Sequence, residues 1–277
     1  MLHNLKSSES TYLQFLHITD CHLLDHGNAL FHQQNTRLNL QTVIHQGISS
    51  HPGVDFILFT GDISQTGNPA SYEVFKSIID SIHIPIFAVP GNHDNPRLLQ
   101  QVIANSPDQS ISIIPLRHHS LILLNSWVKD EHFGRVSKHC LAQLEQHLKS
   151  SDDRFNIFAI HHPPVEVGSP WLDALGLKNA PELLQLINKY SSNSLLLCGH
   201  VHQTIDQQLN QLRLLVTPST CHQFLERTEI MTHDEKSLSA YRHVKIFYNF
   251  RIESNVHYLK PDAEIKKAPD MNLGAFN

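Results

Sequence analysis

The chain has 277 residues, 40% of them apolar and 17% charged, a composition that is typical of globular proteins and excludes a disordered chain. The formal net charge of −5 argues against a broad nucleic-acid-binding surface, which needs an excess of Lys and Arg. No apolar run reaches the roughly 18 residues of a transmembrane helix. The start MLHNLKSSEST lacks the apolar centre of a secretory signal. We therefore expect a cytoplasmic protein with no membrane or nucleic-acid partner.

Apolar β-branched runs alternate with helical patterns, first as βαβαβα and then mostly as strands. Strands are predicted at residues 12–19, 54–60, 85–89, 111–116, 120–125, 156–160, 195–198, 204–209, 212–217, 244–250 and 256–259. Helices are predicted at residues 36–49, 69–82, 97–104, 137–149 and 180–190. Ser137 and Asn179 stand where they could cap the last two helices. The order predicts a layered α/β domain with helices outside a sheet core. We expect one domain at residues 1–260 and a polar tail at residues 261–277.

Cysteine and histidine usage is unusual in opposite ways. The four cysteines, Cys21, Cys140, Cys198 and Cys221, show no closely spaced pair, which predicts reduced thiols that behave as small apolar core residues. The 22 histidines, by contrast, outnumber the 21 Lys and Arg residues together. Histidine is a common metal ligand, so the positions of the histidines relative to the strands carry information.

Five short polar motifs follow predicted strands, where an α/β sheet places its chemistry. They are Asp20-Cys21-His22, Gly61-Asp62, Gly91-Asn92-His93-Asp94, His161-His162-Pro163-Pro164 and Gly199-His200-Val201-His202. In an extended segment, side chains two residues apart point to the same face, so Asp-x-His and His-x-His pairs could converge on one centre. The glycines before Asp62, Asn92 and His200 suit sharp turns where the backbone approaches a cluster closely.

The motifs contain seven residues of metal-ligand type. They are Asp20, His22, Asp62, Asn92, His161, His200 and His202. Seven ligands are too many for one tetrahedral ion and suit two ions about 3.5–4 Å apart. Without a thiolate, the set disfavours structural zinc and allows Fe, Mn, Co or Zn. The sequence therefore predicts a dinuclear metal site.

Together these motifs resemble the calcineurin-like metallophosphoesterases, whose pattern is D-x-H, G-D, G-N-H-[DE], H and G-H-x-H in that order. The resemblance extends from Phe15 to about Phe224. The stretches ITDCHLL, TGDISQTG, PGNHD, HHPP, WLD, KNAPEL, LLLCGHVHQ and TPSTCHQF resemble the bacterial class III 3′,5′-cyclic AMP phosphodiesterases. The resemblance implies a four-layer α/β/β/α sandwich with two divalent or trivalent ions, Fe or Mn foremost and Zn or Co as alternatives. Residues 225–250 match the family pattern less well.

The resemblance also implies a role for each motif residue. One ion would be held by Asp20, His22 and His202, and the other by Asn92, His161 and His200, with Asp62 between them. A hydroxide bridging the ions would attack phosphorus in line. His93 would contact the phosphoryl oxygen and protonate the leaving sugar oxygen, with Asp94 orienting its imidazole. The residues implied in substrate binding are His22, Asp62, Asn92, His93 and His202.

Two points stay open in this interpretation. The family's ligand lies two residues before the proline, which favours His161 over His162. The implied reaction is hydrolysis of 3′,5′-cyclic AMP, a small-molecule partner, to 5′-AMP. The motifs, however, recognise phosphate and metal rather than the base. Hydrolysis of 2′,3′-cyclic nucleotides or glycerophosphodiesters is the alternative.

A catalytically inactive scaffold is disfavoured because all seven positions carry competent ligands. His17 is expected in the core. The sequence does not predict the oligomeric state.

Overall fold

The computed structural model describes residues 11–26, 29–116, 118–150, 154–235 and 238–259. The polar tail expected at residues 261–277 lies outside this part of the chain. Within the described ranges, no helix is long and apolar enough to cross a membrane.

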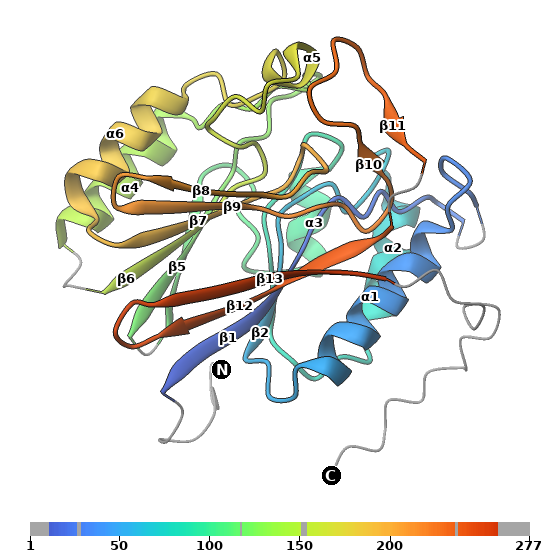
Figure 1. Ribbon diagram of the computed structural model, residues 1–277, viewed down its shortest axis with the longest axis horizontal. Coiled ribbons are helices and arrows are strands. Elements are labelled where there is room, and N and C mark those ends of the chain that lie inside the picture. Colours follow the sequence, from blue (N-terminus) through green and yellow to red (C-terminus); the bar gives the residue numbers. More distant parts are fainter. Residues whose placement is uncertain (1–10, 27–28, 117, 151–153, 236–237, 260–277) are drawn as a thin grey trace.

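Two sheets pack face to face at the centre of the molecule (Figure 1). The strand order of the first sheet is β13 (Ile252–Tyr258), β12 (Ala240–Phe247), β1 (Tyr12–Ile18), β2 (Phe56–Phe59) and β3 (Ile86–Ala88). The order of the second is β4 (Ile111–Leu116), β5 (His119–Leu124), β6 (Phe155–Ala159), β7 (Ser194–Cys198), β9 (Leu212–Val216) and β8 (Ile205–Leu209). Strands β1 to β3 are parallel to one another, as are β5, β6, β7 and β9.

Helices cover the outer face of each sheet (Figure 1). The first sheet carries α1 (Thr36–Ser50), α2 (Pro69–Ile79) and α3 (Pro96–Val102). The second carries α4 (Lys138–Ser150) and α6 (Ala180–Tyr190), with the short α5 (Pro170–Asp173) nearby. Three apolar clusters fill the spaces between these layers, one beneath each helical layer and one between the sheets. The layered α/β prediction and the implied four-layer sandwich are confirmed.

Alternation along β1 explains how one strand serves two cores. Phe15 points into the cluster between the sheets, whereas Leu16 points into the cluster beneath the helices.

All four cysteines are free and buried, as expected for small apolar core residues. The predicted cap at Ser137 is confirmed, since its Oγ accepts the Cys140 N–H at 3.0 Å. Asn179 is the N-cap residue of α6, as predicted, but its side chain makes no capping bond and instead bonds to the backbone N–H and C=O of Val136.

The C-terminal part of the chain differs most from the prediction. The last two strands begin four residues earlier than expected, and β12 pairs antiparallel with the central strand β1. Two short strands, β10 (Gln223–Phe224) and β11 (His233–Asp234), form a small ribbon that the sequence did not predict. Residues 225–250 therefore supply both a strand of the main sheet and a loop region near the strand ends.

Candidate metal centre

The structure brings all seven predicted ligand residues together. The motifs follow the C-terminal ends of β1, β2, β3, β6 and β7, and hence come from both sheets. Donor atoms lie within 4.8 Å of one another in overlapping groups that join Asp20, His22 and His202; Asp20, Asp62 and His161; and His161, His162 and His200. Asn92 joins them through its Oδ1, which lies 3.1 Å from Nε2 of His161. The centre therefore straddles the joint between the two sheets.

Left-handed turns, not extended backbone, produce this convergence. Asp20, His22, Asp62, His200 and His202 all have positive φ, between 47° and 72°. The expectation that each Asp-x-His or His-x-His pair lies on an extended segment is therefore wrong. Asp and His are among the residues that tolerate this conformation, which still costs about 1–3 kcal/mol per residue. Such strain accumulates where a function requires it.

The glycines beside the ligands allow a close approach, as predicted. A Cβ on Gly199 would lie 2.0 Å from Oγ1 of Thr19 and 2.6 Å from Oδ2 of Asp20. Gly61 has φ +96°, and a Cβ there would lie 2.6 Å from Nδ1 of His161. In both places the missing side chain is what lets a carboxylate or imidazole reach the centre.

The pair of His22 and His202 is arranged for a metal ion rather than for a hydrogen bond. Nδ1 of His22 donates to Oε1 of Gln65 at 2.6 Å, and Nδ1 of His202 donates to the His222 carbonyl at 2.7 Å. The two Nε2 atoms then face each other at 3.1 Å. Burial lowers the pKa of His22 to about 3, so its ring is neutral. With Nδ1 of each ring donating, both Nε2 atoms are turned toward the same space, which a cation between or beside them would occupy.

His161 lies on the other side of Asp62, and although burial lowers its pKa, the neighbouring Asp62 carboxylate raises that pKa to about 9. Its Nδ1 donates to the Thr60 carbonyl at 2.7 Å, and its Nε2 lies 3.3 Å from Oδ2 of Asp62. The same carboxylate oxygen lies 4.0 Å from Nε2 of His22. Asp62 thus stands between the two groups of histidines, where a carboxylate shared by two ions would lie. Its other oxygen accepts the His93 N–H at 2.9 Å.

Asp20 and His200 complete the cluster. Burial alone would raise the pKa of Asp20, but His202 and His161 beside it bring the value down to about 2, so the carboxylate is charged. The His200 N–H donates to Oδ2 of Asp20 at 3.0 Å. Nε2 of His200 is buried and has no hydrogen-bond partner among the described residues. An unpartnered buried nitrogen is costly unless an ion or water completes it, so the donor set fits bound metal.

The choice between His161 and His162 is supported by their partners. His162 contacts Ser126 Oγ through Nδ1 at 2.8 Å and donates through Nε2 to the His132 carbonyl at 3.1 Å. Both nitrogens of His162 thus have protein partners, whereas Nε2 of His161 faces Asp62 and Asn92.

The expected contact between Asp94 and the His93 imidazole is wrong. Nδ1 of His93 donates to the Gln65 carbonyl at 2.9 Å. Asp94 accepts instead from the backbone N–H groups of Ser64 and Gly91 and from the Tyr72 hydroxyl, at 2.9–3.0 Å. It therefore supports the turns that carry the ligands. Burial and the neighbouring Asp62 raise the pKa of Asp94 to about 6.

Three residues near the centre escaped the sequence analysis. Gln65 holds both His22 and His93, one with its side chain and one with its carbonyl. Phe31 stacks on His22 at a centroid distance of 5.7 Å, and Phe224 stacks on His202 at 4.5 Å. Gln65 lies inside the stretch TGDISQTG and Phe224 ends the stretch TPSTCHQF, whereas Phe31 belongs to a segment without a periodic pattern.

A two-sheet α/β fold with a buried cluster of His, Asp and Asn at its strand ends is that of a metal-dependent phosphoesterase. The chain belongs to the calcineurin-like phosphoesterase family, whose model matches residues 13–204. Members of this family carry a dinuclear metal centre, in keeping with the cluster described above.

Named relatives match nearly the whole chain. It is 34% identical over 250 residues to the 3′,5′-cyclic adenosine monophosphate phosphodiesterase CpdA of Vibrio vulnificus, covering 89% of this chain and 90% of the relative. It is 31% identical over 261 residues to CpdA of Escherichia coli (strain K12), covering 93% of each. Among solved structures, a dimetal phosphatase from Danio rerio matches with a TM-score of 0.63 and 14% identity, covering 90% of this chain and 99% of that chain.

Proposed function

We propose that this protein is a dinuclear-metal phosphodiesterase that hydrolyses 3′,5′-cyclic AMP to 5′-AMP. The observation that carries the proposal is the convergence of seven ligand-type side chains, with the Nε2 atoms of His22 and His202 3.1 Å apart. The CpdA relatives, which are named for this reaction, support the choice of substrate. The four free, buried thiols support a cytoplasmic location.

The proposed assignment divides the ligands between two ions. Asp20, His22 and His202 would hold one, and Asn92, His161 and His200 the other, with the Asp62 carboxylate shared. Two such ions lower the pKa of water and polarise a phosphoryl oxygen. The imidazole and oxygen donors suit Fe or Mn, with Zn or Co as alternatives.

The remaining steps fall to side chains of the chain itself. His93 is half-buried, and the Gln65 carbonyl fixes its Nδ1–H, which leaves Nε2 to face the substrate. When protonated, this imidazole can donate a proton to the departing 3′ oxygen, the role of a general acid. The His93 N–H holds Asp62 in place, so one residue links leaving-group protonation to the shared carboxylate.

A substrate panel tests the proposal. The protein is loaded with Mn or Fe, and kcat/KM is compared for 3′,5′-cyclic AMP, 3′,5′-cyclic GMP, 2′,3′-cyclic AMP and bis(p-nitrophenyl) phosphate. Preference for 3′,5′-cyclic AMP is expected. Activity on the generic diester alone would keep the metal chemistry and overturn the cyclic AMP assignment. Inactivity on all four with two ions bound would overturn the phosphodiesterase proposal.

A further inference from the structure

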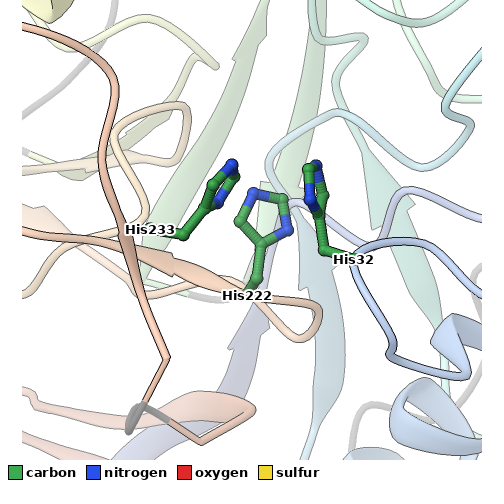
Figure 2. Close-up of side chains that lie close together, drawn as sticks. All are labelled: His32, His222 and His233. Carbon is green, nitrogen blue, oxygen red and sulfur yellow. The ribbon is translucent and has the colours of Figure 1, made fainter.

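A second group of histidines adjoins the seven-ligand centre, with the ring centroid of His222 4.7 Å from that of His202 and 5.8 Å from that of His22. His32 precedes α1, His222 precedes β10, and His233 lies in β11. Figure 2 shows their imidazole rings gathered from these three separate segments. The ring centroids are 4.1–4.8 Å apart, and one ring nitrogen of each residue lies within 4.8 Å of the others. None of the three belongs to a sequence motif that suggested a metal site.

The chemical state of these rings points to a missing ligand. Nδ1 of His233 is buried and has no hydrogen-bond partner among the described residues. Nδ1 of His222 contacts Sγ of Cys221 at 3.3 Å, which leaves Nε2 for another partner. Three imidazoles thus crowd together without the acceptors that would explain the arrangement.

We propose that His32, His222 and His233 bind a divalent transition-metal ion of the zinc type, at a third site beside the dinuclear centre. Three imidazole ligands with an open fourth position are a known zinc arrangement, and they favour Zn, Co, Ni or Cu over Mg, Ca or Mn. With Zn–N distances of about 2.0–2.1 Å, tetrahedral ligand nitrogens lie ~3.4 Å apart. The ligand nitrogens, which lie within 4.8 Å of one another, must therefore converge by up to about 1.4 Å, which side-chain rotation can supply because His32 is exposed and His233 half-buried.

The position of this third site gives it a structural consequence. His32 adjoins Phe31, which stacks on His22, and the β10 segment carries Phe224, which stacks on His202. An ion held by the three histidines would tie the loop before α1 to the β10–β11 ribbon. It would thereby fix the two phenyl rings that flank one half of the dinuclear centre. The inference does not rest on cyclic AMP being the substrate.

Counting bound metal tests the site directly. The full-length chain is dialysed to equilibrium against a buffer of micromolar free Zn²⁺, and bound zinc per chain is measured by mass spectrometry. Wild type is expected to bind three ions, and His32→Ala and His233→Ala two each. His139→Ala, which removes an exposed histidine of α4, is the matched control and should bind three.

Each other outcome contradicts the inference. Two ions in wild type would mean that the histidine cluster holds no metal. Three ions in His32→Ala and His233→Ala would mean that the third ion is bound elsewhere. Fewer than two ions in His32→Ala, whose side chain is exposed and whose loss should not unfold the chain, would mean that the site is not separate from the dinuclear centre. Thermal unfolding of the metal-free variants checks that all four proteins are folded.

Discussion

Replacing Gly91 by alanine should damage the metal centre while leaving the rest of the fold intact. A Cβ at this position would lie 2.2 Å from Oδ1 of Asp62 and 2.3 Å from its backbone nitrogen. Ordinary contact begins near 3.4 Å. Asp94 accepts from the backbone N–H groups of Ile63 and Gly91 and so holds the two segments together, and side-chain rotation cannot relieve the contact with the Asp62 backbone nitrogen. The shared carboxylate must therefore move.

The size of the effect follows from this overlap. Relieving a contact of 2.3 Å to about 3.4 Å displaces Asp62 by about 1 Å. A misplacement of 1 Å at a reacting centre can cost about 10²-fold in rate, which corresponds to roughly 2.7 kcal/mol of transition-state stabilisation. We expect Gly91→Ala to lose at least this factor in kcat/KM and to bind metal more weakly.

The assay combines turnover of a diester with the number of bound ions per chain. Gly176→Ala is the control, because a Cβ there meets its nearest atom at 3.5 Å and the residue has no positive φ. Wild-type turnover and full metal content in Gly91→Ala would refute the argument that the approach of this backbone to Asp62 sets the ligand geometry.

Three further variants test other parts of the site. His93→Ala should keep both ions and lose about 10²–10⁴ in kcat for cyclic AMP. The loss should be smaller for bis(p-nitrophenyl) phosphate, whose leaving group needs no proton, and equal losses would contradict the general-acid role. Asp62→Ala should lose metal as well as turnover, and retained stoichiometry would count against a shared carboxylate. His17 is buried, and its pKa is lowered to about 3, mainly by this burial and to a smaller extent by the charge of Arg242. The unfolded chain, with a histidine pKa of 6.5, therefore takes up the proton first, and His17 costs stability as the pH falls below 6.5. At pH 5, which is 1.5 pH units below the histidine pKa of the unfolded chain, the loss of unfolding free energy reaches about 2 kcal/mol, at about 1.36 kcal/mol per pH unit. The urea-unfolding free energy of His17→Gln should fall by less than that of wild type over this range.

Local patterns were sufficient to predict the strands and the ligand motifs. The continuous apolar run around Phe56 could only be a strand buried on both faces, and the structure places it between two cores. The motif residues could be found because each follows such a run directly. Parallel strands of one sheet end at the same edge, and the structure brings the edges of its two sheets together at the centre.

Features set by tertiary contacts could not be predicted in this way. The two-residue strands β10 and β11 are too short to show a period, so the ribbon and the histidine at its end were missed. Asp94 and Asn179 were assigned roles from their sequence neighbours. Each instead bonds to backbone groups distant in sequence. The turns at Asp20 and His200, both with positive φ, approach each other closely, since a Cβ on Gly199 would lie 2.6 Å from Oδ2 of Asp20, and no window of sequence reveals this contact.

The metal centre depends on holding two sheets in fixed relation, and a buried polar network beneath it does this. His17 belongs to the first sheet, and its Nε2 lies 2.7 Å from Oγ1 of Thr60. Its Nδ1 lies 2.7 Å from Oγ1 of Thr217, the residue that follows β9 of the second sheet. Arg242 of β12 donates to the same Thr217 oxygen and to the Val216 carbonyl. Apolar packing between the sheets could slide, because it has no direction. Directional bonds at Thr217 fix the register, and so set the distance between Asp20 and Asp62 on one sheet and His161 and His200 on the other.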